Sequence, residues 1–466
     1  MSLARPTPDP IAPRFRVRPP AGWINDPNGP FRWHGRHHLF YQHNPAAPVH
    51  TNIHWGHVSS PDLVHWEHHP IALTPTPGGP DEAGCWSGCV VDDDGVPTAV
   101  YTGVDHTHTG LGTICLARAA DPADERLVEW HALPEPVVTA PPAGLDVVMF
   151  RDPFLFRHAG RRWALVGAGH ADGTPSVLLY DCEELTAWRF AGVLLDGHDP
   201  VAAAAFGDKA VGWECPQLFG TSGGEHVLVV SLWDGTPCST AYLTGRLEAD
   251  ADGGLWFTPR AGGRLDQGRD FYAPAVRQDD DRALMWGWSW EPRETSEVLA
   301  AGWAGTLTAP RVVDVRADGT LRVEPAPELE LLRAPEPFAT APGRVPLPVS
   351  YDLTVTARGA TTVTLLRAAD RALTVRLDPA AGTVVLDRSG WPRTGVEESA
   401  RLTVRVPPQP ALTVRILVDG SLLELFAEDR AAVTERVYRR PDDVAELEIA
   451  GDAEVSAWEQ DPPRRG

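Results

Sequence analysis

Lysine is almost absent from this sequence, because Lys209 is the only one and arginine carries nearly all of the positive charge. Lysine and arginine together number 41 against 63 aspartates and glutamates, so the formal net charge is −22. A chain of this sign lacks the basic face that nucleic acids and anionic membranes require, and we expect neither as a partner. We expect the acidic surface to serve solubility, and the shortage of lysine indicates no particular function.

Long apolar runs are missing as well. No stretch is long and apolar enough to cross a bilayer, and residues 1–10 have no apolar segment of the kind that a signal peptide needs. The sequence therefore predicts a cytoplasmic protein without a membrane partner.

Cysteine is sparse, and its spacing is unlike that of a zinc site. The six cysteines all lie at or before Cys238, and none belongs to the paired Cys-x-x-Cys pattern of zinc-binding domains. Ten of the 17 histidines fall between His34 and His69, but they too lack the spacing that metal ligands use. We therefore expect reduced, buried thiols, no metal and no cofactor.

Tryptophan is plentiful but unevenly distributed, and it divides the chain. Fifteen of the 17 tryptophans lie at or before Trp303. This first part has short apolar stretches between Gly, Pro and Asp turns and little helical periodicity, a pattern typical of an all-β sandwich, barrel or propeller. The expected strands are Leu39–Tyr41, Ile53–Val58, Thr98–Tyr101, Trp163–Val166, Val177–Tyr180, Val227–Leu232 and Leu284–Trp288.

A charged connector separates this part from a second β region. We place the first domain at 1–315, a linker at 316–340 with one short helix in Pro327–Arg333, and the second domain at 341–466. The second region alternates apolar and polar residues, as in Tyr351–Thr356, which predicts an antiparallel sandwich. Asp419-Gly420 lies between two such stretches and predicts a β-hairpin.

One acid lies in an unusual stretch, Trp23–Gly29, which reads Trp-Ile-Asn-Asp-Pro-Asn-Gly. Pro27 pushes Asp26 toward an extended conformation, and Asn28-Gly29 favours a tight turn. We therefore expect a rigid turn that presents the Asp26 carboxylate at a strand end, among aromatic side chains suited to sugar rings. The other Asp-Pro pairs of the chain have no such context and are read as turns.

Two further acids have distinctive neighbours. Asp152 follows Arg151, which either holds a carboxylate ionised, clamps a substrate hydroxyl, or only pairs at the surface. Glu214 lies among apolar and aromatic residues in Trp213–Phe219. Such surroundings favour the protonated form of a carboxyl, which a general acid requires near neutral pH. The alternative is a glutamate that points outward from an exposed edge strand.

These stretches carry a family resemblance over essentially the full chain. The sequence resembles glycoside hydrolase family 32, the invertase, inulinase and levanase family, whose three acid boxes occur here in order. The boxes are Trp23–Gly29, Arg151-Asp152-Pro153 and Glu214-Cys215-Pro216, with supporting segments at Tyr41–Pro45, Trp55–His57, Trp86–Gly88, Asp270–Ala273, Trp286–Trp288, Gly302-Trp303 and Val418–Phe426. Two departures are Arg16, where many relatives carry His, and the apolar Ile24 within the first box.

The resemblance implies a fold and a division of labour. The fold is a five-bladed β-propeller followed by a C-terminal β-sandwich, with the active site in a funnel at the propeller axis. By family role, Asp26 is the nucleophile of a retaining hydrolysis, Glu214 is the acid and then the base, and Asp152 stabilises the transition state. This route needs two carboxyls about 5–5.5 Å apart.

The resemblance also implies a fructose-binding subsite. Its residues are Asn25, Gln42, Trp55, Trp86, Ser87, Arg151, Asp270, Tyr272 and Trp288. Amides and hydroxyls bond sugar hydroxyls and tryptophans cover ring faces, although each tryptophan taken singly also suits the core of a propeller.

We therefore predict a cytoplasmic β-fructofuranosidase that releases terminal fructosyl units from sucrose and short fructo-oligosaccharides. The alternatives are an exo-acting fructanase on levan or inulin, a fructosyltransferase, a sucrose 6-phosphate hydrolase and a non-catalytic fructan-binding protein. Product analysis separates transfer from hydrolysis, and sugar binding without product would favour the binding protein. Exposed β edges would also support a homodimer.

Overall fold

The structure is a computed structural model that describes residues 9, 11–107, 110–206, 210–250, 253–279, 281–391 and 400–460. Lys209 and the outermost residues of both predicted domains lie outside this part. In the described chain, strands predominate and helix is limited to α1 (Pro200–Phe206), α2 (Thr295–Ala301) and the 3-10 helix η1 (Pro327–Leu332). The expected all-β class is confirmed. None of these helices is long and apolar enough to span a membrane.

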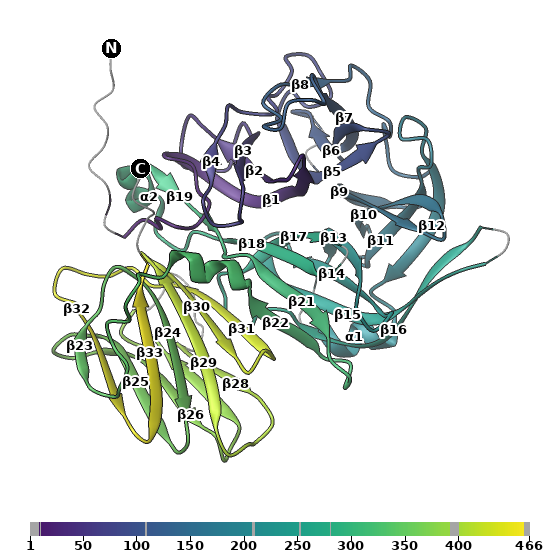
Figure 1. Ribbon diagram of the computed structural model, residues 1–466. Coiled ribbons are helices and arrows are strands. Elements are labelled where there is room, and N and C mark those ends of the chain that lie inside the picture. Colours follow the sequence, from purple (N-terminus) through teal and green to yellow (C-terminus); the bar gives the residue numbers. More distant parts are fainter. Residues whose placement is uncertain are drawn as a thin grey trace, which may run out of the picture.

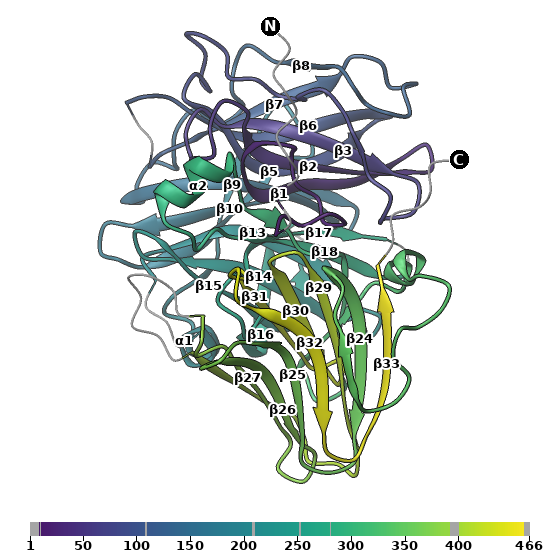
Figure 2. The same cartoon turned by 90° about the vertical axis from the view of Figure 1, so that its left-hand side faces the viewer.

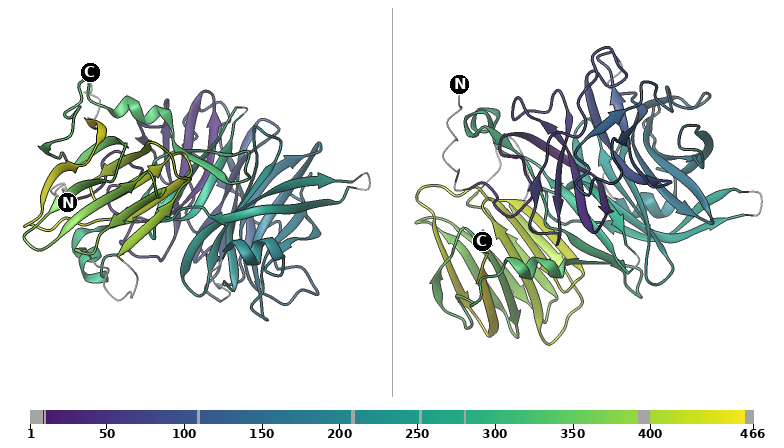
Figure 3. Two further views of the ribbon diagram at one scale, coloured as in Figure 1. Left: turned by 90° about the horizontal axis from the view of Figure 1, so that it is seen from below. Right: turned by 45° about the horizontal axis from the view of Figure 1, so that its top comes forward.

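Five sheets follow one another between residues 22 and 325 of the described chain. Their inner strands are β1 (Gly22–Trp33), β5 (Gly84–Asp93), β9 (Val147–His158), β13 (Gly212–Gly220) and β17 (Tyr272–Gln278). Each inner strand contacts the next one, and β17 contacts β1, so the five strands close a ring around one axis (Figures 1 and 3). Residues far apart in the sequence therefore meet at this axis.

The other strands of each sheet lie outward from the inner strand in chain order, with two exceptions. The short strand β19 pairs in parallel with β1 on its other side, and β20 pairs with β18. These strands are β2 (Arg36–Asn44), β3 (His54–Ser60), β4 (Glu67–His68), β6 (Val96–Val104), β7 (Thr113–Ala119), β8 (Trp130–Ala132), β10 (Arg161–His170), β11 (Pro175–Asp181), β12 (Arg189–Asp196), β14 (His226–Trp233), β15 (Pro237–Ala249), β16 (Leu255–Arg264), β18 (Ala283–Ser289), β19 (Trp303–Ala304), β20 (Thr306–Leu307), β21 (Arg311–Val315) and β22 (Leu321–Pro325).

In each sheet, the register between the inner strand and its neighbouring strand shifts at a similar position along the inner strand. Three of the inner strands carry a proline there, Pro153, Pro216 and Pro274, whereas in β1 the irregular residues are Asn25 and Asp26 and Pro27 follows them. Proline has no N–H for the ladder, so two residues of the inner strand oppose one of its partner and form a bulge. In β5 the extra residue is Ser87.

The expected turn at Trp23–Gly29 is therefore wrong. This stretch is part of the twelve-residue strand β1, and Asp26 lies at a bulge inside the strand instead of at its end. Proline and a residue that tolerates positive φ suit an irregular strand as well as a turn, and β1 has a second irregularity between Asn28 and Phe31. Gly29 has a φ of 44°.

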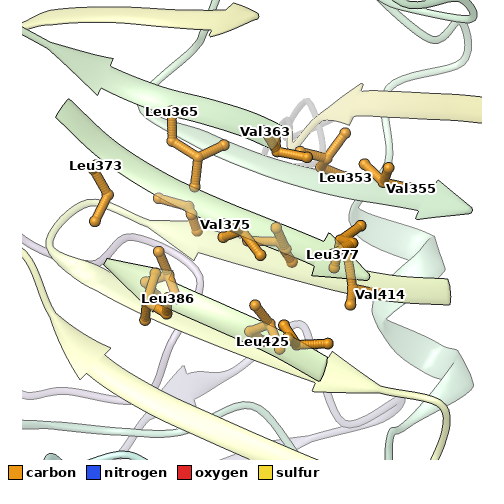
Figure 4. Close-up of a cluster of buried hydrophobic side chains, with 14 of the residues drawn as sticks. Leu353, Val355, Val363, Leu365, Leu373, Val375, Leu377, Leu386, Val414 and Leu425 are labelled. Carbon is orange, nitrogen blue, oxygen red and sulfur yellow. The ribbon is translucent and has the colours of Figure 1, made fainter. Parts of the chain in front are cut away.

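Residues 344–459 form two further sheets packed face to face as a sandwich (Figures 1 and 2). Apolar side chains of both sheets interdigitate between them, among them Leu353, Val375 and Leu425 (Figure 4). The six-stranded sheet contains β23 (Arg344–Pro346), β32 (Val444–Ala450), β25 (Thr361–Arg367), β26 (Ala372–Asp378), β27 (Thr383–Asp387) and β28 (Arg401–Arg405). The five-stranded sheet contains β31 (Ala431–Arg436), β30 (Leu422–Ala427), β29 (Leu412–Asp419), β24 (Ser350–Ala357) and β33 (Ala453–Glu459).

The segments predicted as strands all fall on observed strands, except that Ile53 lies one residue before β3. The hairpin at Asp419-Gly420 is confirmed as β29 and β30, which pair in antiparallel register. The segment 316–340, expected as a linker, contains β22, which pairs with β21 in the fifth sheet, followed by η1.

A buried polar network joins the ring of sheets to the sandwich. Arg311 donates to Asp266 (2.7 Å) and to Glu424 (3.2 Å), and Arg16 also donates to Glu424 (2.9 Å). All four side chains are buried. Because the ion pairs lie at the boundary and out of water, they hold the two parts in one relative orientation.

Candidate active site

The bulges of the inner strands bring the predicted acids to one place. Asp26, Asp152 and Glu214 come from the first, third and fourth sheets, and all three line one cavity of about 520 Å³ at the axis. The backbone is unusual there, since Asp152 has a φ of 66° and Cys215 a φ of 46°. Both residues precede a proline and take the left-handed conformation, which costs free energy and is typical of functional sites.

Asp26 is buried and surrounded by donors. Its Oδ2 accepts hydrogen bonds from Ser87 Oγ (2.6 Å) and Gln42 Nε2 (3.0 Å), and its Oδ1 accepts one from Asn25 Nδ2 (3.1 Å). Burial raises the pKa of Asp26 to about 6, with a further rise from the charge of Glu214, while the Ser87 hydrogen bond opposes the rise. A carboxyl with this pKa is roughly nine-tenths ionised at pH 7.

Asp152 is also buried, and it is tied to the fourth sheet. Its Oδ2 accepts hydrogen bonds from the backbone N–H of Cys215 (3.0 Å) and from the thiol of the same residue (3.5 Å). The thiol also lies 3.6 Å from Asp26 Oδ2. Burial raises the pKa of Asp152 to about 7, and the negative charge of Glu214 adds to this effect.

Glu214 lies between a cation and a phenol. Its Oε1 accepts from Arg151 Nε (2.9 Å) and Nη2 (2.8 Å), and its Oε2 lies 2.6 Å from Tyr272 Oη. The alternative of an outward-pointing glutamate is therefore wrong. The Arg151 guanidinium packs over the rings of Trp233 (5.0 Å) and Trp86 (5.8 Å).

The hydroxyl of Tyr272 has two possible acceptors but one proton. It lies 2.6 Å from Glu214 Oε2 and 2.9 Å from the carbonyl oxygen of Leu232. A carbonyl can only accept, so the Tyr272 hydroxyl donates either to the Leu232 carbonyl or to the Glu214 carboxylate. The contact fixes the position of the Glu214 carboxyl beside Arg151.

The remaining predicted subsite residues divide into two groups. Asn25, Gln42, Trp86, Arg151, Tyr272 and Trp288 line the cavity together with the three acids. The second group lies behind the lining. Ser87 bonds Asp26, Trp55 donates its Nε1 to the Trp86 carbonyl (3.0 Å), and Asp270 accepts the backbone N–H of Arg436 (2.7 Å). Trp55 and Asp270 are fully buried.

Some lining residues were not predicted as site residues. They are Trp23, His50, Gly110, Trp233, Pro237 and Trp290. Trp23 lies within the first acid box, and its ring makes edge contacts with His50 and Trp288 (centroids 6.0 and 5.7 Å apart). Proximity to a box could have identified Trp23, whereas Trp233 ends β14, Trp290 follows β18, and both reach the cavity through the sheet register. No sequence motif marks them.

The histidine-rich region is a packing cluster. His38 Nδ1 lies 3.1 Å from His57 Nε2, and the His57 ring stacks on Phe40 with centroids 4.2 Å apart. Burial lowers the pKa of His38 to about 3 and that of His57 below its ordinary value, so both are neutral near pH 7. Within the described residues, no three His, Cys, Asp or Glu side chains are placed to hold a metal ion. The six cysteines, all within the described residues, form no disulfide bond; five are buried and Cys238 is partly exposed.

Comparison with known proteins identifies the family. Residues 17–325 match the model of the glycosyl hydrolases family 32 N-terminal domain, and residues 338–459 match the family 32 C-terminal model. The chain therefore belongs to glycosyl hydrolase family 32, and the expectation of a glycosidase is confirmed.

The similar proteins span nearly the whole chain. A raffinose invertase of Escherichia coli is 32% identical over 457 residues, covering 92% of this chain and 90% of the relative. A sucrose-6-phosphate hydrolase of Klebsiella pneumoniae is 33% identical over 437 residues, covering 90% and 87%. The solved structure of a Bombyx mori family 32 β-fructofuranosidase has a TM-score of 0.80 and 27% identity, covering 97% of this chain and 94% of that one.

Proposed function

We propose that this enzyme is a β-fructofuranosidase that hydrolyses sucrose and short fructo-oligosaccharides with retention of configuration. The observation that carries the proposal is the convergence of Asp26, Asp152 and Glu214 on one tryptophan-lined cavity. The relatives named as invertases and fructofuranosidases support the substrate class. We also propose that the five sheets are the blades of a five-bladed propeller, with the linker between the end of β22 at residue 325 and about residue 341 instead of starting at 316.

In this mechanism Asp26 attacks the anomeric C2 of the fructosyl unit, because it is largely ionised at neutral pH and Asn25, Gln42 and Ser87 hold its oxygens. Glu214 gives its proton to the departing glycosidic oxygen and later takes one from the attacking water. Positive charge builds on the ring between these steps. Asp152 accepts hydrogen bonds from the fructose hydroxyls and stabilises that charge. Each charged hydrogen bond of this kind contributes roughly 1.5–3 kcal/mol to the stabilisation.

The balance of charge in the cavity favours an uncharged sugar. Its lining includes three acids, while Arg151 is bonded to Glu214 and covered by tryptophan rings. A sucrose 6-phosphate would bring two negative charges to this place. Several relatives carry the name sucrose-6-phosphate hydrolase, so the phosphorylated sugar is the competing substrate.

The test is a substrate panel with purified protein: sucrose, raffinose, inulin, levan and sucrose 6-phosphate, with products identified. We expect release of fructose from sucrose, and a fall in kcat/KM as the pH drops from about 7 to below 6, because Asp152 and then Asp26 become protonated. Asp26→Asn and Glu214→Gln should each lower kcat by roughly a thousandfold or more. Wild-type turnover in either variant would contradict the mechanism.

Three alternatives have distinct outcomes in the same panel. A preference for sucrose 6-phosphate over sucrose would replace the proposed substrate, and preferential release from levan or inulin would indicate a fructanase. Formation of trisaccharides at high sucrose concentration would indicate transfer. The cytoplasmic location and the homodimer remain predictions, checked by cell fractionation and by analytical ultracentrifugation.

A further inference from the structure

The sandwich reaches the wall of the cavity through its edge strand β31. This strand lies on the side of the sandwich that faces the ring of sheets, and it contacts β18 and β22 (Figures 1 and 2). It also runs beside residues 266–270, the loop that leads into β17. The backbone N–H of Gln267 donates to the Ala432 carbonyl (2.8 Å), and that of Asp270 donates to the Thr434 carbonyl (3.2 Å).

The loop lies against β31 at Gly268, where a side chain would not fit. A Cβ placed on Gly268 would lie 2.1 Å from the Thr434 carbonyl oxygen and 2.4 Å from its nitrogen. The neighbouring backbone N–H of Arg269 donates to the Glu435 carboxylate (2.8 Å), which is buried. The loop is therefore held against the edge strand of the sandwich by backbone hydrogen bonds.

Arg436, the last residue of β31, joins two segments of the cavity wall. Its backbone N–H donates to Asp270 Oδ2 (2.7 Å), two residues before Tyr272. Its Nη1 donates to the Ser289 carbonyl (3.4 Å), which lies between Trp288 and Trp290. The side chain is buried, and its Nη2 also donates to Ser421 Oγ (2.9 Å) within the sandwich.

Aromatic rings complete the enclosure of this guanidinium. The Arg436 Cζ atom lies 5.6 Å from the ring centre of Trp303 and 5.3 Å from that of Tyr438. Tyr438 donates to Glu291 (2.7 Å), and Glu291 directly follows the lining residue Trp290. Two residues of the sandwich thus hold the segment 288–291 from behind.

We propose that Arg436 is a positioning residue, which sets the place of Trp288 and Trp290 in the cavity although it belongs to the other part of the molecule. In the same way, Asp270 acts by anchoring the approach to Tyr272 instead of bonding the sugar. The kinetic consequence rests on the proposed function. The sandwich is then part of the binding wall as well as a support for the fold.

The kinetic test is Arg436→Met, which keeps the length of the apolar chain and removes the donors to Ser289 and Ser421. We expect KM for sucrose to rise roughly tenfold while kcat changes less than about threefold, because the wall of the binding cavity moves and the three acids do not. Arg415→Met is the matched control, since Arg415 bonds Asp352 inside the sandwich (2.7 Å). It should lower stability and leave KM unchanged.

A second measurement is independent of activity. Hydrogen exchange of the amides in residues 288–291 should become faster in Arg436→Met and stay at the wild-type rate in Arg415→Met, whereas residues 268–273, which are held through the backbone N–H of Arg436, should change less. A wild-type KM in Arg436→Met, or an equal rise in both variants, would overturn the inference. If Arg436→Met does not fold, Arg436→Lys decides: a raised KM at unchanged thermal midpoint supports the proposal, and a wild-type KM overturns it.

The proposed function can fail separately. If the wild-type protein releases no fructose from any sugar of the panel, the β-fructofuranosidase proposal is wrong. The exchange rates of residues 288–291 would still decide whether Arg436 holds the wall.

Discussion

The acids of this cavity differ in solvent exposure and in their distance from the nearest positive charge. Asp152 is buried, and its Oδ2 bonds only groups of Cys215 among the partners found in the described chain. Glu214 has the Arg151 guanidinium at 2.8 Å and lies partly open to the cavity. A buried carboxylate without a cation of its own is costly to ionise. Asp152 therefore lowers the stability of the fold when it is charged.

This cost gives a pH-dependent prediction for Asp152→Asn. The pKa of Asp152 is raised from 3.8 to about 7, so between these pH values the folded protein holds a proton that the unfolded chain has lost. Wild-type stability then falls as the pH rises from about 4 to about 7, and is flat above. The Asn variant lacks this loss, and its free energy of unfolding should exceed that of the wild type by up to about 4 kcal/mol at pH 8.

Urea unfolding of both proteins at pH 4 and pH 8 checks this expectation. The two free energies should nearly coincide at pH 4. The variant should also lose most of its activity, because the group that stabilises the transition state has become neutral. A variant less stable than the wild type at pH 8 would contradict the account of Asp152.

The strands that carry these residues could be predicted only in part. Short apolar runs and turn residues located outer strands such as β10 and β14, because both faces of each strand are buried and short turns flank them. The inner strands were missed because bulges interrupt their alternation and prolines interrupt their ladders. Those interruptions are also what brings Asp26, Asp152 and Glu214 to the cavity.

Gly29 tests the packing of one inner strand against the next. It has a positive φ, and a Cβ there would lie 2.6 Å from Val90 Cγ2 and 2.7 Å from the Val90 nitrogen of β5. Gly35 has a positive φ too, with nothing within 4 Å of such a Cβ. Gly35→Ala should cost about 1 kcal/mol of backbone strain, whereas Gly29→Ala should cost about 2–4 kcal/mol because β1 must also move away from β5.

Chemical unfolding of the two variants separates strain from crowding. Gly29→Ala should in addition reduce kcat, since Asp26 lies three residues away on the same strand. Equal destabilisation by the two substitutions would show that backbone strain alone explains the choice of glycine at position 29.

At the scale of the whole molecule, the boundary between ring and sandwich is held by buried charge. Glu424 is fully buried and accepts from Arg16 (2.9 Å), from Arg311 (3.2 Å) and from the backbone of Ala309 (3.1 Å). Loss of one partner from such a network leaves another charge uncompensated, which is the costly event for buried ion pairs.

Glu424→Gln should therefore lower the free energy of unfolding by about 3–5 kcal/mol. Glu454, which pairs with Arg358 at the exposed surface, is the matched control, and Glu454→Gln should leave the unfolding midpoint unchanged. The two midpoints are compared by thermal and urea unfolding. A midpoint of Glu424→Gln equal to that of the control would mean that the network adds nothing to the interface.

The sequence by itself determined the β class, the hairpin at Asp419-Gly420 and the three acids, because strand alternation, turn chemistry and short motifs are local properties of the chain. Only the tertiary structure decided which residues meet. Trp233 and Trp290 line the cavity, whereas Trp55 and Asp270 lie behind its lining. Arg436 belongs to the sandwich and contacts the wall of the cavity. The physical reason is that strand register and the ring of inner strands set these distances, and no single segment encodes them.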